Sequence, residues 1–150
     1  GKVDLHPNLI NVVPATATLT LDVRNTDESL LRDAEQEIAA HLAAVAASEG
    51  VTVSSRPLAR FEPVDFHPAV ISMIESIAAE HGHSHMRLPS GAGHDAQMLA
   101  RVCPTSMIFV PSHKGISHNP AEHTDTEQLV AGCDVLLHAL LTLTESEVGR

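Results

Sequence analysis

Alternating hydrophobic and polar positions near the start of the chain predict extended strands. Residues 16–24 alternate strictly, as expected for an antiparallel strand with one buried face. Two further runs, 9–13 and 51–58, are short and apolar enough to form strands as well. The inward positions of the 16–24 strand are apolar, namely Ala17, Leu19, Leu21 and Val23.

Between these strands the apolar spacing changes to that of a helix. We predict a helix over about 28–48, with Asp27 as its N-cap and Gly50 at its end. Its apolar face contains Leu30, Leu31, Ala34, Ile38, Leu42 and Val45. The order strand, strand, helix, strand matches the latter part of a β-α-β-β-α-β module, so residues 1–62 are predicted to form an incomplete ferredoxin-like α+β region.

After a crossover near 60–66, the pattern favours helices connected by short strands. Pro68 suits the first turn of a helix, Met107–Val110 is a continuous apolar run, and Thr124–Glu127 forms a capping-box pattern. The expected elements are a helix over 68–82, a strand over 86–88, a helix over 94–102, a strand over 107–110 and a final helix that opens at Thr124–Glu127 and runs to about 144. We therefore predict an α/β fold, in which residues 63–150 form an α/β segment.

Composition narrows the possible functions. Hydrophobic residues make up 43% of the 150 positions and aromatic residues 2%, so the core is aliphatic and offers no stacking surface for nucleic acid. A net charge of -10 also disfavours binding to the phosphate backbone of nucleic acid. The sequence has no apolar run of about 18 residues, so we predict no membrane span. The first four residues show no signal-peptide pattern, and we interpret the start as a truncation or processing point. Cys103 and Cys133 are expected to be buried free thiols in a reducing compartment, which favours a cytoplasmic location.

A polar loop after the apolar run at 107–110 contains the first candidate site. His118 lies where catalytic ligands often occur in α/β proteins, and Glu122 is near enough to orient its imidazole. The alternative is a surface histidine without a ligand.

A glycine-rich turn precedes the helix expected over 94–102. Gly91 and Gly93 permit close backbone approach to a ligand, and a helix start with His94 in its first turn favours an anion. We expect at least one of the two glycines to have a positive φ or to pack against a ligand cavity. The alternative is an ordinary turn between a strand and a helix.

Arg24 is the third candidate, because a guanidinium can bind a carboxylate through two parallel hydrogen bonds. The alternative is a solvated arginine on an edge strand. If a tight hairpin formed at Pro14, Asn11 and Arg24 would lie roughly 20 Å apart, too far for one small carboxylate. Either the connection is not tight, or the two residues serve different parts of the substrate or different subunits.

Alternating histidines at His81, His83 and His85 fall where the 68–82 helix ends. Imidazoles chelate transition metals, but histidines at a helix C-terminus also interact favourably with the helix dipole. We interpret them in the second way and expect at most adventitious metal binding.

Taken in order, three segments (Asn8–Arg24, Ser90–Ala96 and Gly115–Glu122) resemble the amidase/hydantoinase branch of the dizinc aminoacylase and carboxypeptidase clan. This branch includes N-carbamoyl-L-amino-acid hydrolase, allantoate amidohydrolase and β-ureidopropionase. The resemblance implies a two-metal catalytic domain, usually containing zinc although other divalent metals are possible, and an inserted lid domain that forms a homodimer. Residues 1–62 would be the second half of the lid, and residues 63–150 the C-terminal part of the catalytic domain.

The resemblance also implies roles for the candidate residues. His118 would be a metal ligand, Glu122 would support it, and Asn11 and Arg24 would bind the carboxylate side of a small substrate. Gly91, Gly93 and His94 would line the same pocket. The general base and the remaining metal ligands would precede the lid, so no catalytic group is expected in this chain.

We therefore expect part of a metal-dependent amidohydrolase that cleaves a linear C–N amide or ureido bond, with N-carbamoyl amino acids as the first substrate class. Allantoate and peptide-like substrates stay open. The alternative is a non-catalytic α/β dimerisation module or an inactive fragment. By itself, this chain is predicted to be inactive and to hold no specific zinc pair, because a catalytic zinc normally needs three protein ligands.

Overall fold

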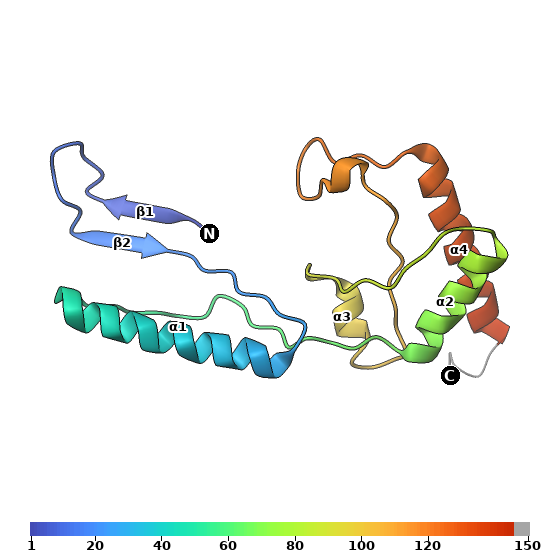
Figure 1. Cartoon of the computed structure of the whole chain (residues 1–150), viewed down its shortest axis with the longest axis horizontal. Helices are drawn as coiled ribbons and strands as arrows, with labels where there is room; N and C mark the ends of the chain where they lie inside the picture. The colour runs from blue at the N-terminus through green and yellow to red at the C-terminus, as the bar shows by residue number, and fades with distance from the viewer. Residues whose placement is uncertain (146–150) are drawn as a thin grey trace. The chain divides into compact units, whose positions relative to one another are not determined.

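An antiparallel hairpin begins the first of two structural units. In the computed structural model, which describes residues 1–145, β1 (Val3–His6) pairs with β2 (Thr16–Leu19) (Figure 1). Residues 7–15 connect the strands, so the connection is not a tight hairpin. The strand expected over 9–13 is wrong, since these residues lie in the connecting loop, and β1 was not predicted although residues 2–6 alternate in polarity.

β2 ends earlier than predicted, and its apolar side chains are exposed. The pairing stops at Leu19, and both strands are solvent-exposed along their whole length. The expectation of a half-buried strand over 16–24 is therefore wrong for this chain. A buried face needs a second layer packed on it, and the strands pack extensively only against each other in the part of the chain that the structure describes.

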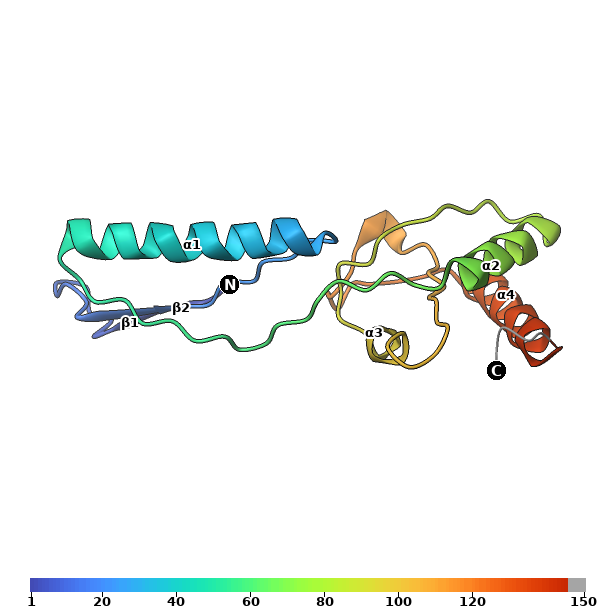
Figure 2. The same cartoon turned by 90° about the horizontal axis from the view of Figure 1, so that it is seen from below.

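Helix α1 (Glu28–Glu49) follows, as predicted, and both of its ends are set by local residues. Asp27 accepts a hydrogen bond from the Leu30 N–H at 3.0 Å, and Gly50 ends the helix with φ 65°. Figure 2 shows α1 running alongside the hairpin. The predicted apolar face is correct for four buried or half-buried residues, Leu31, Ala34, Ile38 and Leu42, whereas Leu30 and Val45 are exposed.

Ion pairs connect the segment after α1 back to the helix. Arg60 contacts the carboxylates of Glu28 at 2.8 Å and Glu35 at 3.1 Å, and Arg32 contacts Glu62 at 3.5 Å. The segment runs without a paired partner strand, so the strand predicted over 51–58 is not formed among residues 1–145. The first unit, Gly1–Pro63, therefore consists of a hairpin, one long helix and a returning segment.

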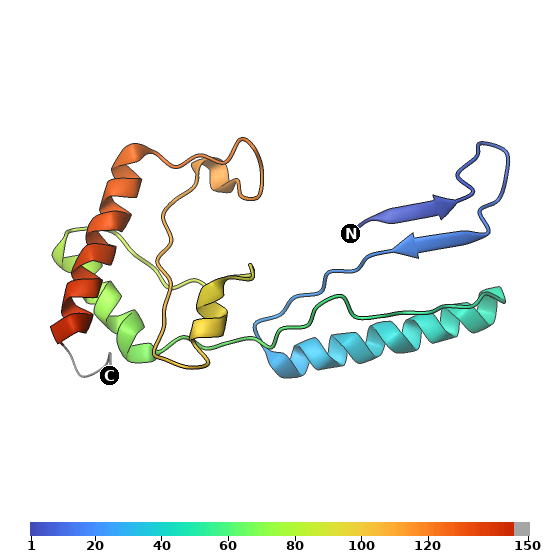
Figure 3. The same ribbon diagram turned by 180° about the vertical axis from the view of Figure 1, so that it is seen from behind.

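Two packed helices form the core of the second unit, Val64–Arg150. α2 (Pro68–Glu80) has Pro68 in its first turn, as predicted, and packs against α4 (Thr126–Glu145), as Figure 3 shows from behind. The contact buries Ile77 and Ala78 of α2 against Val135 and Ala139 of α4. The partly buried residues around this cluster are Met73, Ile74 and Ile108.

The remaining elements of this unit are short. α3 (Asp95–Leu99) and a 3-10 turn (His113–Gly115) are separated by the apolar run that ends at Val110. The strands predicted over 86–88 and 107–110 are not formed within the described residues. A strand is defined by hydrogen bonds to a neighbour, and these extended segments have no paired strand beside them.

Two expectations from composition also change. Both Cys103 and Cys133 are free, but they are exposed rather than buried. α4 is long and apolar enough to cross a membrane by length and composition alone. That is weak evidence, because core helices meet the same criteria and α4 contributes Val135 and Ala139 to the core. The chain is a mixed structure of helices and one small sheet, so the broad α/β class is as expected.

Candidate functional site

The loop that contains His118 is shaped by its own backbone contacts. The His113 N–H donates to the His123 carbonyl at 2.7 Å and closes the base of the loop, while Ser112 Oγ donates to the Ile116 carbonyl. His118 is exposed and has φ 55°, a left-handed backbone that is uncommon for residues other than glycine. Such an outlier persists only where neighbouring contacts hold it, and it often marks a functional loop.

Glu122 provides that contact. Its Oε2 accepts a hydrogen bond from the backbone N–H of His118 at 2.9 Å. We expected this carboxylate to orient the imidazole ring, whereas here it holds the main chain. The Asn119 side chain adds a second local contact, because its Oδ1 accepts from the Ala121 N–H at 2.9 Å. The loop therefore presents an exposed imidazole on a fixed backbone.

Arg24 forms the planar fork that its proposed role requires. Its Nε and Nη2 atoms donate to the two carboxylate oxygens of Asp22 at 2.9 and 2.7 Å. The hydrogen bond from Arg24 lowers the pKa of the Asp22 carboxyl, and the same contact raises the pKa of Arg24. Asp22 was not among the predicted site residues. Its position two residues before Arg24, on the same side of the alternating pattern, was the available signal.

Asn11 lies elsewhere in the first unit. It is exposed in the loop that joins β1 to β2 at one end of the hairpin, whereas Arg24 follows β2 beyond the other end. In this chain the hairpin therefore separates the two residues. The connection is not tight, yet the two residues remain apart, which leaves the alternatives that they serve different parts of the substrate or different subunits.

The glycine-rich turn differs from its expected geometry. Positive φ occurs at Gly50, Gly82 and Gly115 among the described glycines, so the expectation of a positive φ at Gly91 or Gly93 is wrong. A Cβ at either position would meet no atom within 4 Å, so the space beside both Cα atoms is open in this structure. Neither Gly91 nor Gly93 therefore needs a left-handed backbone for the turn to lead into α3.

His94 ends the turn as the N-cap of α3. Its Nδ1 accepts a hydrogen bond from the Ala96 N–H at 3.0 Å. This contact uses a helix N–H group that we expected to be available to an anion. α3 is also shorter than the predicted 94–102 helix, ending at Leu99. The Ala96 N–H is therefore not available to an anion at this helix end.

The predicted residues are divided between the two units. Asn11 and Arg24 belong to the first unit, whereas Gly91, Gly93 and His94 belong to the second, together with His118 and Glu122. Direct contact joins His118 to Glu122. Among residues 1–145, no group of three or more His, Cys, Asp and Glu side chains is arranged to hold a metal ion.

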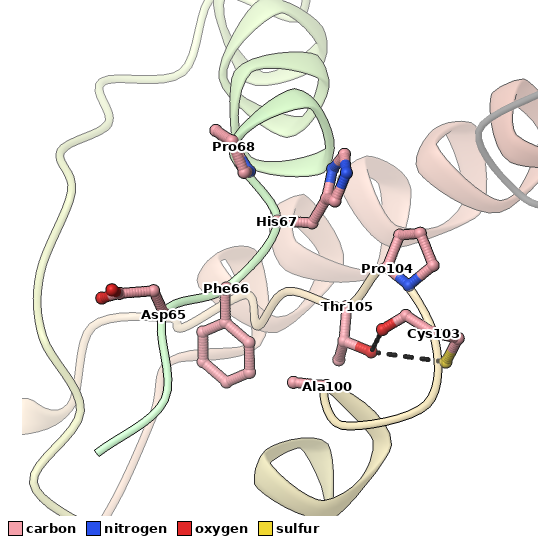
Figure 4. Close-up of a pocket in the computed structure, with 8 residues that line it drawn as sticks. All are labelled: Asp65, Phe66, His67, Pro68, Ala100, Cys103, Pro104 and Thr105. Atoms are coloured by element: carbon pink, nitrogen blue, oxygen red, sulfur yellow. Dashed lines mark hydrogen bonds between the residues drawn. The ribbon is translucent and has the colours of Figure 1, made fainter.

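The second unit also has a mainly apolar pocket of about 330 Å³ that sequence analysis did not predict (Figure 4). Asp65–Pro68, before and at the start of α2, form one side, and Ala100 with Cys103–Thr105 form the other. The His67 N–H donates to the Thr105 carbonyl at 3.0 Å and connects the two sides. His67 Nδ1 is buried and has no hydrogen-bond partner among the described residues. No predicted site residue lines this pocket.

Comparison with solved structures identifies the class of protein. A crystal structure of an amidase of the hydantoinase/carbamoylase family from Burkholderia multivorans matches 95% of this chain with a TM-score of 0.86 and 39% sequence identity. The match covers 34% of that amidase chain. The chain belongs to the peptidase family M20/M25/M40, whose family model matches residues 6–142.

Two curated relatives have named activities. An N-carbamoyl-L-amino-acid amidohydrolase from Rhizobium meliloti is 39% identical over 97% of this chain. An allantoate amidohydrolase from Escherichia coli is 37% identical over 95% of this chain. The chain spans 35% of the length of each relative. The predicted family resemblance is therefore confirmed.

Proposed function

We propose that this chain forms part of a metal-dependent amidohydrolase that cleaves a linear C–N amide or ureido bond, with N-carbamoyl amino acids as substrates. The observation that carries the substrate class is the fork between Arg24 and the Asp22 carboxylate. In it, a guanidinium binds a carboxylate through two atoms in one plane. Carbamoylated amino acids and allantoate, named in the relatives, both combine a ureido group with a carboxylate.

In this proposal Arg24 exchanges one carboxylate for another. The substrate carboxylate replaces Asp22 in the fork, so the guanidinium is charged and oriented before the substrate arrives. Asn11 contributes amide hydrogen bonds as well, and because the hairpin separates it from Arg24 within one chain, the two residues serve different parts of the substrate or different subunits. Gly91 and Gly93 are proposed substrate-binding residues of the second unit, and a Cβ at either position would meet nothing within 4 Å. His94 is a further proposed substrate-binding residue, and its Nδ1 accepts a hydrogen bond from the Ala96 N–H.

The metal requirement is met only in part by this chain. A divalent metal, zinc in our proposal, activates water and polarises the scissile carbonyl. His118 fits one nitrogen ligand, since its imidazole is exposed on a loop held by Glu122. The described residues do not fit a complete site with three protein ligands, so we assign no step of the metal chemistry to this chain.

The organisation of the whole protein is part of the same proposal. The first unit would be half of a lid domain that forms a homodimer, and the second would belong to the catalytic domain. The division between Pro63 and Val64 is compatible with this assignment. A cytoplasmic location and the absence of nucleic-acid and membrane partners complete the proposal.

The substrate role of Arg24 is tested in a protein of the full length of its relatives. Arg24→Lys keeps the charge but loses the fork, so we expect KM for an N-carbamoyl-L-amino acid to rise about tenfold or more, as expected for loss of a charge-assisted hydrogen bond. Ammonia release with N-carbamoyl-L-amino acids and allantoate gives the readout. Arg56→Lys, at another exposed position of the first unit, is the matched control and should leave KM unchanged. Unchanged kinetics in Arg24→Lys would show that the arginine has no substrate role.

The chain by itself provides a second test. After chelation and zinc addition, we expect no turnover of an N-carbamoyl amino acid above background. Two zinc ions bound per chain together with turnover would contradict our assignment of the missing ligands.

A further inference from the structure

Two histidines from different helices of the second unit lie ring against ring, far along the chain from His118. His81 follows the last residue of α2, and His138 belongs to α4. Their ring centroids are 4.4 Å apart, and the rings are tilted by 58°. Both side chains are exposed, so a hydrated ion has access to them. We propose that His81 and His138 form a two-imidazole binding site for a transition-metal ion, with Cu²⁺ or Ni²⁺ preferred over Zn²⁺.

The hydrogen bond of the His138 ring leaves its Nε2 atom available to bind a metal ion. Its Nδ1 lies 2.9 Å from the Asp134 carbonyl oxygen. A carbonyl oxygen only accepts, so Nδ1 carries the proton and Nε2 of the neutral ring has its lone pair directed away from the helix backbone. Metal-binding histidines commonly donate their other ring N–H to a carbonyl in this way, which fixes the tautomer and the ring orientation.

The ring separation selects a coordination geometry. A metal–nitrogen bond of about 2.0–2.1 Å places a metal roughly 3.2 Å from each ring centroid. Two imidazoles at 90° around one ion then have centroids about 4.5 Å apart, and at a tetrahedral angle about 5.2 Å. The observed centroid separation of 4.4 Å is near that of the 90° arrangement, so the two rings are close enough to bind one ion from adjacent positions, as imidazoles do in the tetragonal sites of Cu²⁺ and Ni²⁺. Water would complete the coordination, since no third protein ligand is arranged beside the pair among residues 1–145.

The structure changes our interpretation of the 81–85 segment. From sequence, we expected adventitious chelation by neighbouring histidines at most. The ring centroid of His83 is 6.1 Å from that of His81 and the two rings are nearly parallel, whereas the ring of His138, from the other helix, is closer at 4.4 Å. A bound ion would therefore connect the end of α2 to α4 instead of joining residues within one loop.

Metal titration of the untagged chain tests this site. Because the exposed thiols of Cys103 and Cys133 bind the same ions, the reference protein carries Cys103→Ser and Cys133→Ser. We expect one Ni²⁺ or Cu²⁺ per chain by calorimetry, with Zn²⁺ binding more weakly. His81→Ala and His138→Ala should each weaken binding by at least about tenfold. His41→Ala, an exposed histidine of α1, is the control and should change nothing.

Two outcomes would overturn the proposal. Equal losses in all three alanine variants would show non-specific binding by surface histidines. Loss in His81→Ala and His83→Ala with none in His138→Ala would show chelation by the 81–85 segment alone. Circular dichroism of each variant shows whether it remains folded.

Hydrogen exchange gives a readout that needs no substitution at the site. An ion that joins α2 to α4 stabilises only the state in which the helices are packed. At a concentration one hundred times Kd, amide exchange through opening of this helix pair should slow by about one hundredfold. Unchanged exchange in α2 and α4 under saturating Ni²⁺ would show that the ion does not connect the helices and would refute the two-helix site.

Discussion

Gly132 of α4 provides the sharpest test of how α4 packs against the apolar run that precedes the His118 loop. A Cβ at this position would lie 2.4 Å from Cγ1 of Val110, the last residue of the apolar run that leads into the loop. Ordinary contact begins near 3.4 Å, so the valine would have to retreat by about 1 Å. Valine has few alternative rotamers, and both residues are half-buried. We therefore expect Gly132→Ala to move α4 and the run apart.

The magnitude follows from two opposing effects. Overpacking of this kind costs about 1–3 kcal/mol, whereas replacing a mid-helix glycine by alanine gains about 0.8–1.0 kcal/mol. The expected net result is a destabilisation of about 1 kcal/mol. In a Val110→Ala background the obstructing methyl group is absent, so the same Gly132→Ala substitution should instead stabilise the chain by about 1 kcal/mol. The sign of the effect should reverse between the two backgrounds.

The assay must distinguish the two units. The chain has no Trp or Tyr, so intrinsic fluorescence is uninformative, and helical circular dichroism reports α1 together with α2 and α4. Amide exchange in α4 under urea, followed by mass spectrometry, measures the second unit by itself. A double-mutant cycle on Gly132 and Val110 gives the coupling free energy. Stabilisation by Gly132→Ala in both backgrounds would refute the close packing of α4 on Val110.

Two further predictions concern the first unit. Hydrogen bonds from Arg32, and to a smaller extent from Arg60, lower the pKa of Glu28 below its ordinary 4.5. The stability that these hydrogen bonds contribute is therefore present above about pH 4.5, and it is lost as the pH falls through the lower pKa of the folded state. In Glu28→Gln, the free energy of unfolding measured with urea should no longer show this decrease at acid pH. In the control Glu49→Gln the decrease should remain. Asp27→Ala should destabilise α1 by about 0.5–2 kcal/mol by exchange of its first-turn amides, and Asp27→Asn, which retains the cap, should not.

The helices were predictable because their determinants are local. Asp27 and Gly50 set the ends of α1 through contacts within one turn, and Pro68 begins α2 as its fixed φ favours. The strands were not predictable to the same degree. The runs over 51–58 and 107–110 have strand-like sequences, but a strand also needs a partner, and none pairs with them among the described residues.

The candidate site shows the same division between local and distant determinants. The Arg24 guanidinium is oriented by Asp22 two residues earlier, and the backbone of His118 is held by Glu122 four residues later. Arg24 and His118 are thus each held by a carboxylate from the same segment of the chain. Bringing a guanidinium and an imidazole to one substrate is a different requirement, because it depends on residues far apart in the sequence. A sequence pattern of a few residues contains the first kind of information, so Arg24 and His118 could be selected as candidates from sequence. The carboxylate of Asp22 beside Arg24, and the contact of His81 with His138, emerged only from the structure.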